Sequence, residues 1–481
     1  MHKPFFALVL ALISIASYAV TVDEPNRELS PTSTRTVSGT RIVTYKNGPV
    51  PVDLSTTTIA VLVPNGSGGY SALTGTGTSS GTFTIPNVPK GYYLLQVGTD
   101  YVWTSENEVN ADSVAYYRSN IVAADSSTTL TFDLTNLNSW QETDFFEMVC
   151  PNNLSFEYYF PTIGETTFTG TFPYDSVIPA NLSVASDGDQ YYIAQLSTQN
   201  LGGYPFTGLG RYMAPRKFTQ AQGSDTPIDG ELKTITQSYE FEANVNGADL
   251  TAQALAANPG AVLSYANVGL DVYPGSFAKG QNTDTPDLVI LQSPPFLTTN
   301  GDLGQVLYGN PYSSKWPLFV FYSWGSLTSY LAAGATSSES LLTGVFGSTL
   351  TLPTPTSPIK PLAGVVSAPT VNGVNFFNNV SGVETTPTLS WSPPTVGAAN
   401  NYLVGISQLS NSAGNTVINP VASFYTQSTS LIVPPGVLSA GQAYVFEISS
   451  EYIPGVNFAK TPFMSGSTSA VAQVTSGIMQ P

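Results

Sequence analysis

Residues 82–97 read TFTIPNVPKGYYLLQV. The first four residues alternate between polar and apolar side chains, and residues 91–97 are rich in tyrosine, leucine and valine. Both patterns favour β-strands. The proline and glycine residues at 86, 89 and 91 indicate a connection between them. The stretch therefore predicts two strands that follow each other closely.

The same pattern continues towards the N-terminus. Strands are expected at 36–43 and 58–63, with turn signals at Asn47-Gly48-Pro49 and Pro64-Asn65-Gly66. Short strands at regular intervals, separated by such turns, are typical of an antiparallel sandwich.

Residues 35–135 resemble a carboxypeptidase-regulatory-like domain, which is a transthyretin-like β-sandwich. The resemblance depends on four motifs: VSGT at 37–40, GPVPV at 48–52, IAVLV at 59–63 and GTFTIPNVPKGYYLLQVG at 81–98. It implies a non-catalytic module beside other exported domains. The chain departs from the family at 52–57, where the family usually enters its second strand sooner.

Residues 365–481 resemble a fibronectin type III domain. PTLSWSPP at 387–394 is similar to its B strand, with Trp391 in the core, and the C, E and F strands correspond to 401–406, 429–433 and 444–448. Leu438, six residues before Tyr444, matches the corner where a tyrosine hydroxyl bonds to upstream backbone. The first segment, 371–383, is longer than usual, and the chain has no Arg-Gly-Asp.

The middle of the chain, 136–350, is predicted as a β-rich domain of unknown type. One short helix is expected at 247–258, where GADLTAQALAAN precedes Pro259-Gly260, and a second at 337–346. The main strands are expected at 154–160, 166–172, 190–196, 238–245, 263–272, 287–291 and 318–324. Residues 351–364 hold four prolines and are predicted as a linker. The fold class is therefore all-β, a multidomain chain of sandwiches.

The N-terminus has the pattern of an export signal. Residues 1–19 carry Lys3, an apolar run and a small-residue site ending at Ala19, which predicts a signal peptide. Residues 20–34 are polar and are expected to form a flexible leader. The mature protein is thus expected to be secreted or at the cell surface.

Charge excludes several classes of partner. The chain has 15 basic and 32 acidic residues, a net charge of −17. Nucleic acids and anionic lipids need clustered Lys and Arg, so neither is an expected partner. No apolar stretch beyond residue 19 reaches the roughly 18 residues of a membrane helix, so no membrane insertion is predicted.

Histidine-dependent chemistry is also excluded. The single histidine, His2, lies in the predicted signal peptide, which leaves no imidazole for a catalytic triad or a common zinc site. Cys150 is the only cysteine, so no intramolecular disulfide is possible, and a buried thiol is expected. The single cue for calcium, Asp187-Gly188-Asp189, is a common turn sequence. No cofactor, metal or catalytic residue is assigned.

Two kinds of residue remain as candidates for chemistry. Paired carboxylates need no imidazole, and Glu240 and Glu242 lie two apart on one strand face, which is also the pattern of a solvated face. Further acids are Glu157, Glu165 and Asp175. Ser314 and Lys315 are adjacent, whereas Ser-Lys chemistry would need an S-x-x-K spacing on a helix, which the sequence does not offer. Arg211, Arg216 and Lys217 would bind an anionic sugar or balance local charge.

Aromatic pairs in the middle region are the candidates for recognition. Tyr158-Tyr159-Phe160, Tyr191-Tyr192 and the run 316–324 would stack on sugar rings or pack in the core. Adjacent residues of a strand point to opposite faces, so one of each pair is expected in the core.

Three functional hypotheses follow. The first is an exported, non-enzymatic protein that binds a glycan or another surface protein through 136–350. The second is a carboxylate-based polysaccharide hydrolase with its site in the same region. The third is a passive component of an envelope layer.

Overall fold

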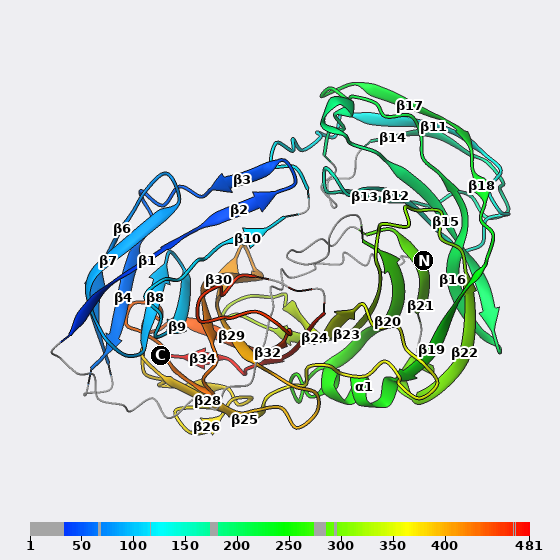
Figure 1. The fold of residues 1–481 in the computed structure, drawn as a ribbon. Helices are drawn as coiled ribbons and strands as arrows, with labels where there is room; N and C mark the ends of the chain where they lie inside the picture. Colours follow the sequence, from blue (N-terminus) through cyan, green and yellow to red (C-terminus); the bar gives the residue numbers. More distant parts are fainter. Residues whose placement is uncertain are drawn as a thin grey trace.

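The computed structural model describes residues 33–65, 69–115, 117–173, 181–273, 285–292, 296–464, 466 and 468–481. The predicted signal peptide and residues 20–32 of the leader lie outside the described residues. Strands make up 54% of the structure and helices 3%, which confirms the all-β prediction. In Figure 1 the N-terminal module (blue) and the C-terminal module (orange to red) lie together, and the central region (green) forms the other side.

The N-terminal module is a sandwich around Val37, Val61, Phe83, Ile85 and Leu95. One sheet contains β1 (Thr34–Thr40), β7 (Thr82–Pro89) and β6 (Thr76–Gly77). The other contains β4 (Ile59–Pro64), β5 (Tyr70–Thr74), β8 (Tyr93–Val97) and β9 (Asp100–Thr104). A small sheet joins β2 (Ile42–Tyr45), β3 (Gly48–Pro51) and β10 (Ser113–Val114).

The strand predicted at 82–85 is longer than expected. β7 continues to Pro89, which is paired with Thr34 of β1. The register shifts between Arg35 and Val37, opposite Asn87, whose φ is 60°. This bulge lets the strand pass its two prolines, which supply no backbone donor.

The C-terminal module is a second sandwich. One sheet is ordered β26 (Val374–Asn375), β25 (Ser367–Val371), β28 (Thr388–Ser392), β31 (Ser430–Ile432). The facing strands are β30 (Asn415–Thr426), β29 (Asn401–Ser412), β32 (Ala443–Tyr452) and β33 (Ser469–Thr475), with β34 (Met479–Gln480) and β27 (Val380–Ser381). Trp391 lies in the core and meets Tyr402 edge-on, with ring centroids 5.3 Å apart. The strands predicted here are present; the family resemblance stays a prediction.

Tyr444 forms the predicted corner. Its hydroxyl accepts a hydrogen bond of 2.9 Å from the backbone N–H of Ser439, and the ring is buried. We expect Tyr444→Phe to lower the free energy of unfolding by about 1 kcal/mol, because the N–H loses its partner. Thermal unfolding measures this, with the exposed Tyr92→Phe as control. Equal melting temperatures for the two variants would show that the corner contributes nothing.

The two terminal modules share a core. The rings of Tyr101 and Phe424 stack with centroids 4.6 Å apart, and Leu94 and Tyr101 belong to the C-terminal cluster. β9 pairs in parallel with β30, from Asp100–Ser423 to Val102–Tyr425. The two modules therefore pack together as one body and are not independent domains joined only by the chain.

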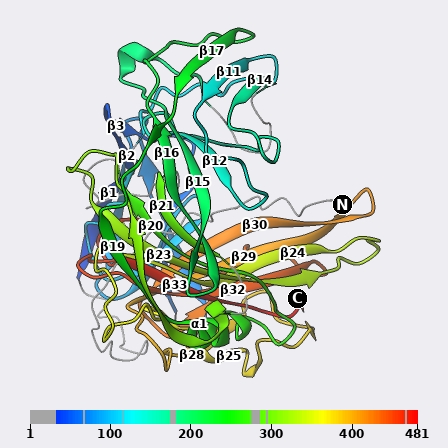
Figure 2. The ribbon, with the colours of Figure 1, turned by 90° about the vertical axis from the view of Figure 1, so that its right-hand side faces the viewer.

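The central region is a large curved sheet that continues into the C-terminal module, because β24 pairs with β33. Its strands are β12 (Phe145–Cys150), β13 (Ser155–Tyr159), β15 (Tyr192–Leu201), β16 (Tyr204–Met213), β18 (Lys233–Thr234), β20 (Val262–Val272), β21 (Asp287–Gln292), β23 (Leu318–Tyr330) and β24 (Glu339–Thr349). A separate sheet of β14 (Phe168–Pro173), β11 (Thr129–Thr135) and β17 (Asp225–Glu231) stands at the outer end in Figures 1 and 2. β11, which lies at the end of the predicted 35–135 module, thus pairs with two strands of the central region.

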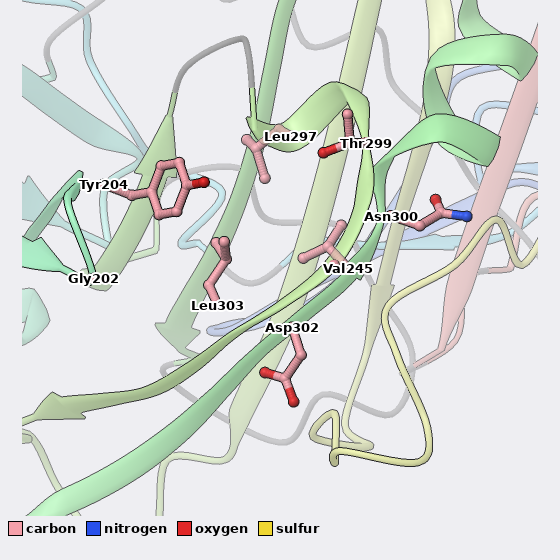
Figure 3. Close-up of a pocket in the computed structure, with 9 residues that line it drawn as sticks. Gly202, Tyr204, Val245, Leu297, Thr299, Asn300, Asp302 and Leu303 are labelled. Atoms are coloured by element: carbon pink, nitrogen blue, oxygen red, sulfur yellow. The ribbon is translucent and has the colours of Figure 1, made fainter.

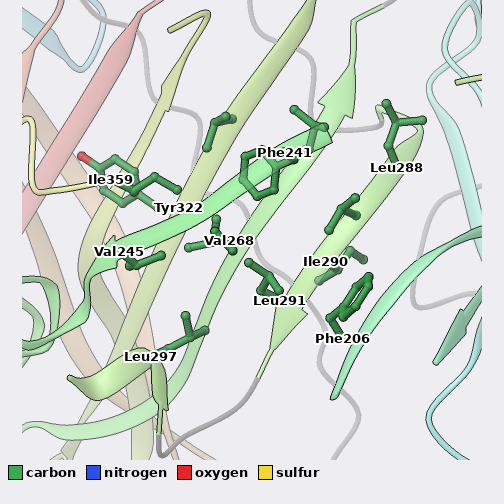
Figure 4. Packing of buried hydrophobic residues seen from close by; sticks show 14 of the residues in the cluster. Phe206, Phe241, Val245, Val268, Leu288, Ile290, Leu291, Leu297, Tyr322 and Ile359 are labelled. Carbon is green, nitrogen blue, oxygen red and sulfur yellow. The ribbon is translucent and has the colours of Figure 1, made fainter. Parts of the chain in front are cut away.

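The ribbon of β19 (Tyr239–Asn246) and β22 (Asn300–Tyr308) packs on one face of this sheet together with α1 (Gly247–Leu255). Figure 4 shows Phe241 and Val245 of β19 among side chains of β20, β21 and β23. Trp324 is completely buried, and its Nε1 donates to Thr251 Oγ1 of α1 at 3.1 Å. The predicted helix at 247–258 is confirmed over α1.

The prediction of a second helix is wrong. The segment 337–346 is instead part of β24, which pairs with β23 from Val320–Thr349 to Tyr330–Glu339. Eleven residues of pairing outweigh weak helix propensity. The segment predicted as a linker packs against β19: Ile359 is buried and exchanges backbone hydrogen bonds with Asn244 and Asn246 at 2.9 and 2.8 Å.

Candidate functional site

A groove of about 300 Å³ opens on the central region between the β15–β16 turn and the start of β22 (Figure 3). We call it the Tyr204 groove. The residues that line it are Gly202, Tyr204, Val245, Leu297, Thr299, Asn300, Gly301, Asp302 and Leu303.

A tight turn presents Tyr204. Leu201 and Tyr204 are paired across the two-residue loop Gly202-Gly203, whose φ values are 58° and 97°. Positive φ at both positions is what a type I′ hairpin turn requires, and glycine meets this without strain. The ring of Tyr204 is 41% exposed as a result. Sequence reasoning missed this residue, although Gly-Gly between two strand-like runs is a hairpin signal.

The floor of the groove is apolar and the rim is polar. Val245 and Leu297 are buried, whereas Asn300 and Asp302 are exposed. Asn300 is held at the start of α1, where its Oδ1 accepts from the Ala248 N–H at 3.0 Å. Asp302 Oδ1 accepts from the Gly304 N–H at 2.8 Å. These bonds fix the direction of both side chains.

The predicted pair Glu240 and Glu242 lies next to this rim. Phe241 between them is buried, so the two acids share the outward face of β19 as expected. Desolvation and the carboxyl of Asp302, with a smaller effect of Glu240, raise the pKa of Glu242. The pair belongs to an open face and does not line the groove.

A second group of acids is closed off from solvent. Asp271 and Asp287 are register partners on β20 and β21, and Glu147 of β12 lies close to Asp287. Burial raises the pKa of Asp287 to about 6, and burial together with the charge of Asp287 raises those of Glu147 and Asp271 further. Thr285 Oγ1 donates to Asp271 Oδ2 at 3.0 Å. We call these three acids the buried carboxyl cluster; none lines the Tyr204 groove.

No metal site emerges within the described residues: no group of three or more His, Cys, Asp or Glu side chains there is arranged to hold an ion. At the predicted calcium cue, Asp189 is fully buried and bound by Arg118, with 2.9 Å between Nη2 and Oδ2. The guanidinium of Arg118, rather than a metal ion, thus supplies the positive charge beside Asp189. The described part of the chain also contains no helix that is long and apolar enough to span a bilayer.

No protein-family model and no curated protein matches this chain. Among solved structures, the crystal structure of trypsin-activated alpha-2-macroglobulin from Escherichia coli aligns at 12% identity with a TM-score of 0.10. The alignment covers 90% of this chain and 30% of the macroglobulin chain. A score this low carries no argument about fold or activity.

The other acidic candidates are scattered. Glu157 is buried on β13, and Glu165 is exposed in the loop before β14. Asp175 lies outside the described residues. Of the two described acids, one is therefore buried in the sheet and the other is exposed in a loop.

The basic and nucleophilic candidates either make local hydrogen bonds or lie exposed on the surface. Arg211 Nε donates to Asn138 Oδ1 at 2.9 Å, and Lys217 Nζ donates to the Gly188 carbonyl at 3.2 Å. Arg216 and the Ser314-Lys315 pair are exposed. Local contacts, rather than an anion site, account for Arg211 and Lys217.

The predicted alternation of aromatic residues is confirmed where the side chains are described. Tyr159 is buried and Phe160 is 62% exposed, while Tyr191 is buried and Tyr192 half-buried. Most of these rings pack in the core rather than offering a surface. Cys150 is also buried, and burial raises the pKa of its thiol to about 12, as expected of an unreactive cysteine.

Proposed function

We propose that the protein is an exported, non-enzymatic binding protein that recognises a neutral glycan through the Tyr204 groove. One observation carries this proposal: an exposed tyrosine, an apolar floor and a polar rim with one amide and one carboxylate line the same groove. Export rests on the signal-like pattern at 1–19.

The groove has the chemistry that a sugar ring needs. The apolar C–H face of a sugar packs on an aromatic ring, and its hydroxyls donate to carboxylate and amide oxygens. The volume of about 300 Å³ is at the lower end of ligand cavities, which suits one or two sugar units at the end or side of a chain.

The carboxyl geometry favours binding over hydrolysis. A retaining glycosidase holds its two carboxyl groups about 5–5.5 Å apart, and an inverting one further apart. Asp302 is the one acid among the described residues that line the Tyr204 groove, so the lining offers no second carboxyl group. The buried carboxyl cluster has no opening to the groove in the lining described above. Both facts support a binding role.

We expect Tyr204→Ala to weaken glycan binding about tenfold, because the loss of an aromatic contact costs about 1 kcal/mol or more. The measurement is affinity electrophoresis of residues 20–481 through gels that contain different neutral polysaccharides, followed by staining for released sugar ends. Tyr239→Ala is the matched control, since that tyrosine is 52% exposed and lies outside the groove. Unretarded migration of the unaltered protein in every gel contradicts glycan binding, and released ends contradict the non-enzymatic role.

A further inference from the structure

A larger groove, of about 720 Å³, lies where the central region meets the C-terminal module. Residues near the β23–β24 connection and after α1 form one wall, and residues 377, 379 and 476–478 form the other. We call it the junction groove. Its volume is in the usual range of ligand cavities, which often occur between structural units.

The lining carries no formal charge. Among the described residues that line the groove there is no Asp, Glu, Lys, Arg or His, although the chain has 32 acids. Tyr330 is the one titratable group there, and its hydroxyl is bound to Thr475 Oγ1 at 2.7 Å and to the Ser476 carbonyl at 2.8 Å. A charged ligand would lose water without gaining a counter-charge, so an uncharged ligand fits this surface.

Apolar and hydroxyl groups both face the groove. Val262 and Leu331 are 67% and 52% exposed, which is unusual for such side chains in a charge-free depression. Ser329 and Ser340 hydroxyls lie 2.9 Å apart.

We infer that the junction groove binds an uncharged amphiphile, a molecule with an apolar chain and a hydroxyl-bearing head. The chain packs on Val262 and Leu331, and the head bonds to the serine pair. This site is separate from the Tyr204 groove and does not depend on its function.

The direct test uses three probes on the full-length mature protein, by isothermal titration calorimetry. Octyl glucoside below its micelle concentration supplies both parts of the ligand, octanoate replaces the head with a charge, and methyl glucoside lacks the chain. We expect octyl glucoside to bind at least about tenfold more tightly than the other two, since each lacks one set of contacts. Failure of octyl glucoside to bind, or equal binding of octanoate, overturns the proposal.

Surface variants locate the site. Leu331→Ser should weaken octyl glucoside binding, whereas Leu307→Ser, with the same substitution at a leucine of 51% exposure on β22, should not. Ser329→Ala removes one hydroxyl of the serine pair, and should weaken binding about two- to tenfold. Unchanged affinity in both Leu331→Ser and Ser329→Ala, or an equal loss in Leu307→Ser, shows that the amphiphile binds elsewhere.

Discussion

Replacing Arg118 with methionine is expected to lower the free energy of unfolding by about 3–5 kcal/mol, because it leaves a buried carboxylate without its counter-charge. Arg118 is 2% exposed and Asp189 is fully buried. The guanidinium also donates to the Leu182 carbonyl at 2.9 Å, so one side chain joins the segments around 118, 182 and 189. Urea denaturation of the purified variant measures the loss.

A double-mutant cycle separates the ion pair from simple packing. Asp189 also accepts from Asn152 Nδ2 and the Val184 N–H, both at 2.8 Å, so Asp189→Leu is destabilising by itself. We expect the double variant Arg118→Met/Asp189→Leu to be more stable than the sum of the two single losses predicts, since no charge remains buried. Additive losses would mean that the two charges do not interact.

Raising the pH from about 4 to 8 is expected to destabilise the protein by several kcal/mol. Burial raises the pKa of Glu451 to about 8 and that of Asp287 to about 6, while unfolded carboxyls titrate near 4. The folded state therefore binds more protons than the unfolded state across this interval, and stability falls as pH rises through it. The full penalty is reached only above the folded pKa values. Thermal unfolding between pH 4 and pH 8 measures the trend.

Glu451→Gln tests the origin of this trend. Asn401 Nδ2 donates to Glu451 Oε2 at 2.7 Å, a bond that a glutamine oxygen retains. We expect the variant to match the unaltered protein near pH 4 and to exceed it at pH 8 by about 3–5 kcal/mol, because one pKa unit corresponds to about 1.4 kcal/mol. Glu165→Gln removes an exposed carboxyl and is the control. A protein that is more stable at pH 8 than at pH 4 would contradict this account.

Local sequence patterns predicted most of the strands, because alternation and turn residues act over a few positions. They failed where long-range pairing decides the structure. The segment 337–346 has enough helix formers to suggest a helix, but its pairing with β23 and β33 makes it a strand. The prolines of 351–364 suggested a semi-rigid linker, and only its pairing with β19 shows that Ile359 is buried.

The sites were harder to predict for the same reason. Glu147, Asp271 and Asp287 are spread over 140 positions of sequence, and no single-sequence pattern joins them. Glu240 and Glu242 were visible as a pair because they share one strand face. Tyr204 carried a local signal in its Gly-Gly turn, but the partners that make it part of a groove come from β19, η2 (Phe296–Thr298) and β22.

The pairing of β9 with β30 has a consequence for biogenesis. Residues 100–102 of β9 pair with residues 423–425 of β30. More than 300 further residues must therefore be synthesised before the edge strand of the N-terminal module is covered. Until then Leu94 and Tyr101 lack the C-terminal core residues that they pack against in the folded protein, and the unpaired edge of β9 can pair with another chain. A chain that emerges from the ribosome N-terminus first thus remains prone to aggregation for a long interval. Chains truncated before residue 423 would remain in that state.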